Sequence, residues 1–141
     1  WTGSYDELLT RSELEEIREY FKLPHVTSDF TVMAGKYECP AGRKKVHILS
    51  DGSVCPCPFM HISFGNILRE PLEEIMDRIW SFDVFMSRPD YCLVSESVEF
   101  NEKYLKPVFK SQTIPLYYTE HPMFGPVGSD IREEAVVGVR S

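Results

Sequence analysis

Apolar residues recur at helical spacing in three stretches of the chain. In the first stretch, Ser12 is the predicted N-cap, Glu15 completes a reciprocal cap, and Pro24 ends the helix. The apolar face of this helix would consist of Leu14, Ile17 and Phe21. The pattern also predicts a short helical turn over residues 5–9 and a strand or extended connector over residues 25–33.

The second stretch predicts a helix from Pro71 to about Trp80, because the first helical position does not need the amide hydrogen that proline lacks. Ser81 is a candidate cap for a further helical segment over 82–86. The third stretch predicts a helix over 98–106, which Pro107 would limit. After Ser111, prolines and glycines at intervals predict a wrapping tail or a weakly ordered end.

Between the first two helices, the pattern predicts a β-hairpin. Residues 45–49 and 53–57 would be its strands, and Asp51-Gly52 would be a two-residue turn because glycine tolerates a positive φ. Pro56 cannot donate a ladder hydrogen bond, so the returning strand should lie at an edge or end at once. The predicted fold class is therefore α+β, a small β-hairpin with flanking α-helices around a cysteine-ligated metal site.

Composition and charge narrow the classes of function. With 141 residues, of which 43% are hydrophobic and 26% charged, the chain fits one globular domain. The net charge of -7 argues against a nucleic-acid partner, and the short basic run Arg43-Lys44-Lys45 is expected to be a solvated turn or strand start. No run approaches the ~18 apolar residues of a membrane span and no leader is visible, so we expect no membrane partner and a cytoplasmic location.

The candidate chemistry lies in four cysteines. Thiolate sulfur is the ligand that iron-sulfur clusters and structural zinc prefer, and four donors complete a tetrahedral site. These donors are Cys39, Cys55, Cys57 and Cys92. Cys55-Pro56-Cys57 is a Cys-x-Cys and not the Cys-x2-Cys of common zinc ribbons, so zinc is the alternative metal rather than the favoured one.

Other interpretations of the same residues stay open. The four cysteines could be buried core thiols or could form two disulfides. In a true strand Cys55 and Cys57 would point to opposite faces, which favours Cys57 as the ligand. His47 and His61 offer a second metal site, although a lone histidine is more often an ordinary satisfied or exposed residue. The chain has no Gly-x-Ser-x-Gly, phosphate-binding glycine loop or His-Glu-x-x-His motif, so a self-contained hydrolase or kinase is unsupported.

One combination of spacings resembles a known module. Cys39 is followed after twelve residues by Gly52, which four residues separate from Cys57, and then come Gly65-Asn66 and a predicted helix. This pattern is similar to the SPASM or twitch domain found at the C-terminus of many radical S-adenosylmethionine enzymes. The resemblance covers about residues 37–92. The later run of closely spaced cysteines that holds a second cluster in the full SPASM pattern is missing, so the one-cluster, twitch-like form is the nearer match.

The resemblance implies an auxiliary 4Fe-4S cluster bound by Cys39 and Cys57, with Cys92 adding to the shell. Cys55 would either fill the fourth position or leave it open to substrate or water. The Cys-x3-Cys-x2-Cys motif for the S-adenosylmethionine cluster is absent, so radical generation would belong to an N-terminal barrel that this chain lacks. The chain itself would be a non-catalytic fragment of an oxidoreductase acting on a peptide or small molecule. It would serve electron transfer, substrate positioning or a lid.

We therefore expect three segments in a chain that is part of something longer, since it starts at Trp1 rather than Met. Residues 1–36 would be a helix and connector to the preceding domain. Residues 37–110 would be the SPASM/twitch-like cluster-binding domain, and residues 111–141 a C-terminal tail. The alternative function is a structural zinc-binding interaction domain without catalysis.

Overall fold

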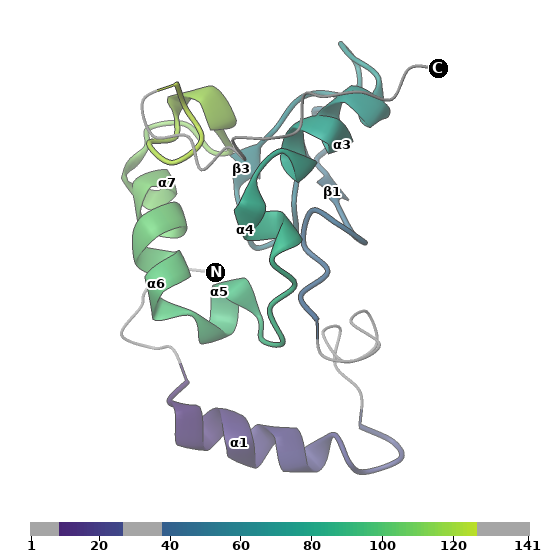
Figure 1. The fold of residues 1–141 in the computed structure, drawn as a ribbon, viewed down its shortest axis with the longest axis vertical. Helices are drawn as coiled ribbons and strands as arrows, with labels where there is room; N and C mark the ends of the chain where they lie inside the picture. The colour runs from purple at the N-terminus through teal and green to yellow at the C-terminus, as the bar shows by residue number, and fades with distance from the viewer. Residues whose placement is uncertain (1–8, 27–37, 127–141) are drawn as a thin grey trace.

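The computed structural model describes residues 9–26 and 38–126. Most of the predicted turn over 5–9 and of the predicted strand over 25–33 lies outside these residues. The described part contains several helices and two small two-stranded sheets, which confirms the α+β fold class. Figure 1 shows α5, α6 and α7 along one side of the molecule, α3 and α4 along the other, and α1 below them, where Arg18 forms an ion pair with Glu96 of α5.

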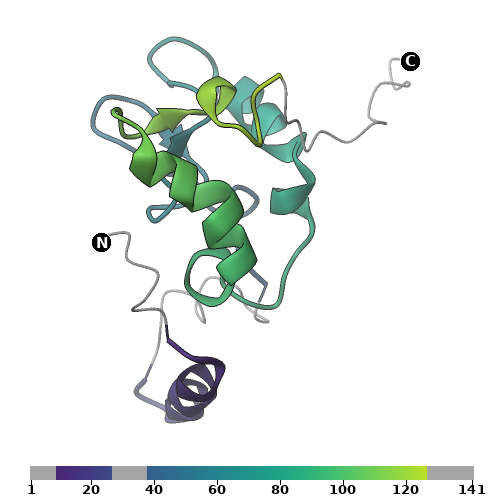
Figure 2. The ribbon, with the colours of Figure 1, turned by 90° about the vertical axis from the view of Figure 1, so that its left-hand side faces the viewer.

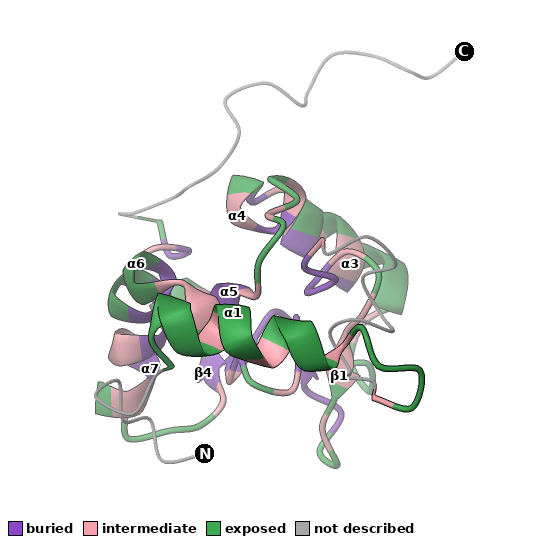
Figure 3. Cartoon of the chain, turned by 90° about the horizontal axis from the view of Figure 1, so that it is seen from below, coloured by how far each residue is buried: buried purple, intermediate pink, exposed green. Residues whose placement is uncertain are grey.

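Helix α1 (Arg11–Tyr20) begins two residues earlier than predicted. Its N-cap is Thr10, whose hydroxyl accepts from the Glu13 amide while the Glu13 carboxylate accepts from the Thr10 amide at 2.7 Å. The prediction of Ser12 and Glu15 as the cap is therefore wrong. The sequence contains the same capping signature twice, two residues apart. The structure uses the earlier pair, which makes the helix about half a turn longer. No residue of α1 is fully buried, and Figure 3 shows its outer surface as mostly exposed.

The predicted hairpin is confirmed, with shorter strands. β1 (His47–Ile48) pairs antiparallel with β2 (Val54–Cys55), and His47 lies opposite Cys55. The turn has three residues rather than two, because the Leu49 amide bonds to the Ser53 carbonyl oxygen and leaves residues 50–52 as the loop. Gly52 closes it with a φ of 85°, as a three-residue hairpin loop requires.

The two helices after the hairpin begin later than predicted. α3 (Leu72–Trp80) has Pro71 as its N-cap and not as its first residue. Ser81 ends α3 by donating its hydroxyl to the Arg78 carbonyl oxygen at 2.7 Å, so it does not cap α4 (Asp83–Met86), whose N-cap is Phe82. The apolar face of α3 packs through Ile75 and Ile79, which are fully buried.

The third predicted helix continues past Pro107. α5 (Leu93–Glu96) is followed, after the extended Ser97, by α6 (Val98–Phe100), a π-helical turn (Asn101–Leu105) and α7 (Lys106–Lys110), and Figure 2 shows α6 to α7 as one continuous column. The prediction that Pro107 limits the helix is wrong. The wide π turn just before it, in which the Lys106 amide bonds to the Asn101 carbonyl oxygen, leaves room for a ring that a regular turn would exclude.

The segment after Ser111 joins the core. β3 (Ile62–Ser63) pairs parallel with β4 (Leu116–Tyr117), and the short 3-10 helix Tyr118–Glu120 follows. Phe64 packs its ring against Phe82, Phe85, Tyr118 and Phe124. Within the described residues, no helix has the length and apolar character needed to cross a membrane.

Candidate metal centre

Three of the four cysteines line one cavity of about 70 Å³. Cys39, Cys57 and Cys92 come from three separate segments of the chain, and Cys55 does not reach the cavity. The remaining wall is largely apolar and consists of Pro40, Ala41, Lys45, Pro58, Phe59, Met60 and Val94. An apolar, water-poor wall around convergent sulfurs is the kind of setting in which protein groups tune a metal cluster.

A tight turn positions Cys39. The Pro40 carbonyl oxygen accepts from the amides of Arg43, Lys44 and Lys45 at 2.9–3.1 Å, so the chain closes on itself directly after Cys39. Gly42 completes the turn with a φ of 68°, and its amide bonds to the Lys45 and Pro56 carbonyl oxygens, both at 2.9 Å. The second of these bonds ties the turn to the residue that precedes Cys57.

A backbone hydrogen bond connects the first and the last cysteine segments. The Cys39 amide donates to the Pro89 carbonyl oxygen at 2.8 Å. Three residues later Cys92 is the N-cap of α5, and its own amide donates to the Glu96 carboxylate at 3.2 Å. Cys92 therefore reaches the cavity from the start of a helix, although more than fifty positions in sequence separate it from Cys39.

Backbone amides surround the sulfur atoms of the two buried cysteines in the cavity. Amides of Leu93 and Ala41 bond to the Cys39 thiol, and amides of Phe59 and Met60 bond to the Cys57 thiol. Such donors favour the thiolate. Burial acts against it and dominates, so the pKa of Cys39 is raised and that of Cys57 is raised to about 12. Without a positive partner these sulfurs stay protonated, and a bound metal would supply that partner.

Cys55 has a different environment from the three cavity cysteines. It ends β2, is 1% exposed, and has its pKa raised to about 12, first by burial and then by the neighbouring Cys57 and Asp51. His47 and His61 do not line the cavity, so neither candidate histidine joins the sulfurs there. All four cysteines are free thiols, which leaves the disulfide interpretation without support.

The sulfurs share a cavity but do not form a ready coordination shell. In the described residues, no group of three or more His, Cys, Asp or Glu side chains stands close enough to hold a metal ion. The electrostatic coupling among the three cavity thiols is nevertheless direct, because Cys92 raises the pKa of Cys39 and both raise that of Cys57.

Comparison with protein families identifies the segment that contains this cavity. Residues 39–93, less than half of the chain, match the family model of SPASM, described as an iron-sulfur cluster-binding domain. We call residues 39–93, which match this model, the SPASM segment. The family resemblance predicted from the cysteine spacing is thereby confirmed. No curated protein and no solved structure matches the chain.

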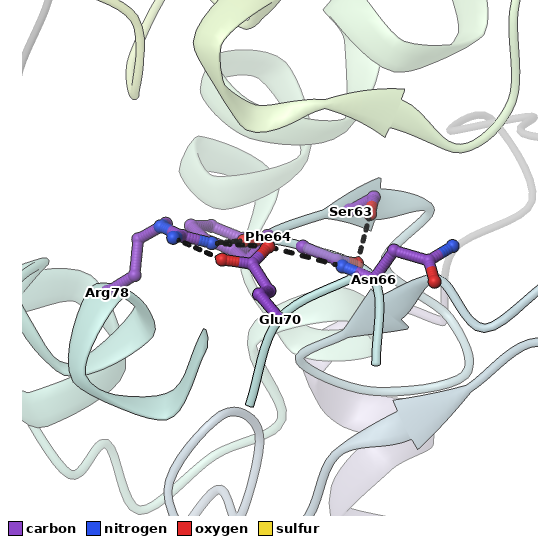
Figure 4. Close-up of polar contacts among 6 residues, drawn as sticks. Ser63, Phe64, Asn66, Glu70 and Arg78 are labelled. Carbon is purple, nitrogen blue, oxygen red and sulfur yellow. Dashed lines mark hydrogen bonds and ion pairs between the residues drawn. The ribbon is translucent and has the colours of Figure 1, made fainter. Parts of the chain in front are cut away.

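The Gly65-Asn66 pair of the SPASM segment lies beside an ion pair, and Asn66 forms an isolated antiparallel bridge with Ser53 just before a turn over residues 67–69. Arg78 of α3 donates to both carboxylate oxygens of Glu70, at 3.1 and 2.6 Å, and to the Phe64 carbonyl oxygen at 2.5 Å. Figure 4 shows Arg78 and Glu70 converging on Phe64 and Asn66, and Ser63 donates to the Gly65 carbonyl oxygen at 3.0 Å. This network holds α3 against the residues that follow β3.

Sequence reasoning missed Arg43. The basic run was expected to be solvated, but the Arg43 side chain is only 14% exposed and pairs with Glu38 at 2.6 Å. The prediction of a solvated side chain is wrong for this residue because, in the turn closed by Pro40, its side chain is held against Glu38. Its position, four residues after a candidate ligand, was the signal that could have singled it out.

Proposed function

We propose that Cys39, Cys57 and Cys92 hold one auxiliary 4Fe-4S cluster of a radical S-adenosylmethionine enzyme. The observation that supports this is the meeting of these three thiols in one apolar cavity inside a SPASM segment. Cys55 lies outside the cavity, so we assign the fourth position to substrate or water rather than to Cys55.

The residues present suit such a group. Met60 is buried, and with its apolar neighbours it keeps water from the sulfurs. The amides of Leu93, Ala41, Phe59 and Met60 that bond to sulfur stabilise negative charge on the thiolates. When bound, the cluster would supply one-electron chemistry, while the protein holds its ligands and excludes water.

The wider context is also part of the proposal. The chain lacks a Cys-x3-Cys-x2-Cys motif, so an N-terminal radical barrel would bind S-adenosylmethionine. The SPASM segment would serve electron transfer or the positioning of a peptide or small-molecule substrate within that oxidoreductase. Free thiols of this kind are typical of the cytoplasm, which is the location that we propose.

The test is the iron, acid-labile sulfide and zinc content of protein purified without oxygen, together with its visible spectrum. About four irons and four sulfides per chain with a broad band near ~400 nm would support the proposal. One zinc per chain without iron would replace it with the structural zinc-binding interaction domain. Protein without any metal after anaerobic reconstitution would overturn both and return the cysteines to the core.

A further inference from the structure

Glu96 holds the backbone of Cys92 at the start of the short helix α5. Its backbone amide donates to the Cys92 carbonyl oxygen at 2.9 Å, and its carboxylate accepts from the Cys92 amide at 3.2 Å. Cys92 is the N-cap of α5, and its thiol lines the cavity with Cys39 and Cys57. The two bonds from Glu96 therefore set the place from which the third sulfur enters the cavity.

A cation from another helix pairs with the Glu96 carboxylate. The second carboxylate oxygen accepts from Nη2 of Arg18 at 2.5 Å, across 78 positions of sequence. The Glu96 side chain is only 13% exposed, whereas that of Arg18 is 45% exposed. A carboxylate so far withdrawn from water is costly unless a charge and hydrogen-bond donors match it, and Arg18 and the Cys92 amide are such partners.

Helix α1, which carries Arg18, does not belong to the core. None of its residues is fully buried. A groove of about 670 Å³ runs between α1 and the start of α5, and it is lined by Leu14 and Arg18 on one side and by Tyr91 and Glu96 on the other. The ion pair joins the two sides of this groove, so a movement of α1 breaks the pair without disturbing the core.

We propose that Glu96 is a positioning residue for Cys92, and that Arg18 makes the hold on this ligand depend on the position of α1. The inference rests on the proposed function for the role of Cys92 in binding a cluster. Cys92 is the least buried of the three cavity cysteines, so its place depends most on support from outside the core. When α1 moves away, water competes for the Glu96 carboxylate and the hold on Cys92 weakens. Since α1 precedes the SPASM segment, the position of the residues before that segment is transmitted to the ligand through this pair.

The first test needs no cluster. It measures the rate at which iodoacetamide alkylates each cysteine of the metal-free full chain without oxygen, with mass spectrometry as the readout. Arg18→Met should raise the rate at Cys92 about fivefold, because a partly exposed ion pair is lost. The rates at Cys39 and Cys57 should stay native, which shows that the fold is intact. Arg18→Lys keeps the charge and should restore much of the native rate at Cys92.

Two further variants separate the pair from a general effect on α1. Arg11→Met is the matched control, because Arg11 also lies on α1 but pairs with Glu15 of the same helix and is 94% exposed. It should leave the rate at Cys92 unchanged. Glu96→Ala removes the bond to the Cys92 amide as well as the ion pair and should raise the rate about tenfold. Adding Arg18→Met to Glu96→Ala should then have no further effect, since the two side chains act as one unit.

The second test uses the iron-loaded chain. Arg18→Met should bind the native amount of iron but release it to a chelator about fivefold faster than the native protein, and Arg11→Met should release it at the native rate.

Three results would overturn the inference alone. These are a native alkylation rate at Cys92 in both Arg18→Met and Glu96→Ala, an equal rise in Arg11→Met, or an equal rise at all three cavity cysteines in Arg18→Met. A native chain that binds no iron would instead overturn the proposed function, and the alkylation rates of the metal-free chain would still decide the role of Glu96.

Discussion

The four cysteines of this chain have unequal surroundings, and the difference decides which of them can share a metal. Cys39 and Cys57 receive backbone amides at sulfur and line the cavity with Cys92. Cys55 is just as buried but lies outside the cavity, where its electrostatic neighbours are Cys57 and Asp51. The burial of a thiol therefore does not identify it as a metal ligand unless the cavity that it faces is known.

We expect Cys39→Ala, Cys57→Ala and Cys92→Ala each to remove most of the bound iron, because each takes one thiolate from a site with only three. Cys55→Ala should keep the iron content and the visible band of the native protein. This substitution should lower the free energy of unfolding by about 1 kcal/mol, because it shortens a small buried side chain. Iron and sulfide content per folded chain is the measurement.

The stability of each variant is the control for this series. Circular dichroism and a urea melt would separate loss of a ligand from loss of the fold. Native iron content in any of the three cavity variants would remove that cysteine from the ligand set. Loss of iron in a well-folded Cys55→Ala protein would move Cys55 into it.

For single residues, the sequence predicted which residue types are candidate metal ligands, but it did not predict which of them lie close together. Sulfur chemistry and the spacing from Cys39 to Cys57 indicate an iron-sulfur module from the sequence alone. The approach of Cys92 depends on a backbone bond from Cys39 to Pro89, which no local pattern encodes. Arg43 was misjudged for the same reason, because burial of a long charged side chain depends on what the turn folds against.

Among the elements, the turn over residues 39–45 does the most to shape the cavity. Its glycine, Gly42, adopts a positive φ and lies against α3 and α4, where Trp80 donates its indole N–H to the Gly42 carbonyl oxygen at 2.9 Å. A β-carbon on Gly42 would stand 2.7 Å from a carbon of Ile79 and 3.2 Å from the Phe85 ring, both in the core.

Gly42→Ala should therefore lower the free energy of unfolding by about 2 kcal/mol or more, combining left-handed backbone strain with overpacking. Gly52→Ala is the comparison, since Gly52 also has a positive φ, but a β-carbon there would meet Oδ1 of Asn66 at 2.6 Å and the exposed Leu68 at 2.8 Å rather than core side chains. It should lower the free energy of unfolding less than Gly42→Ala does, because side chains near the surface move aside more easily than a packed core. Urea unfolding of the two variants checks this, and equal losses would show that the contact with Ile79 and Phe85 contributes nothing.

Element boundaries were the least predictable feature of the secondary structure. The capping signature of α1 was present twice, and sequence alone did not choose Thr10 over Ser12. The predicted helix ended before Pro107, because a proline normally ends a helix. The real helix continues past it through a π turn, which has no sequence signature of its own. The hairpin, whose Gly52 requires a positive φ, was predicted correctly apart from the length of its strands and one residue in its turn.

For the molecule as a whole, the aromatic core joins the SPASM segment to the residues that follow it. Phe64 of the SPASM segment packs on Phe124, and β3 pairs with β4 across more than fifty positions. His121, which is 0% exposed, belongs to the same core. Part of the segment that was expected to be a tail therefore packs into the core beside the SPASM segment. Contacts between residues distant in sequence define this arrangement.

His121 is held in its neutral form. Its Nδ1 accepts from the Met123 amide at 3.1 Å, so the proton sits on Nε2, which donates to the Tyr104 carbonyl oxygen at 2.8 Å. A second proton would have to displace the Met123 amide. Burial lowers the pKa of His121 in the folded protein, and the bond to Tyr104 opposes this only in part.

The stability of the protein should consequently fall as the pH drops below about 6.5, the usual pKa of histidine in an unfolded chain. In that range His121 takes up a proton in the unfolded chain but not in the folded protein. The free energy of unfolding therefore decreases by up to about 1.4 kcal/mol per pH unit. Above pH 7 neither state is protonated there and the effect vanishes. Urea unfolding at pH 7.5, 6.5 and 5.5 measures the slope.

His121→Gln should flatten this slope, although it lowers stability at every pH because the hydrogen bonds of His121 are lost. His61, whose pKa burial also lowers, accounts for part of the remaining slope. All these proteins keep the same cysteines, so loss of bound metal in acid affects them alike. The carboxylates held ionised by hydrogen bonds, such as Glu70 beside Arg78, lose their contribution only below about pH 4.5, outside the range measured. An equally steep slope in His121→Gln would mean that another buried group carries the pH dependence.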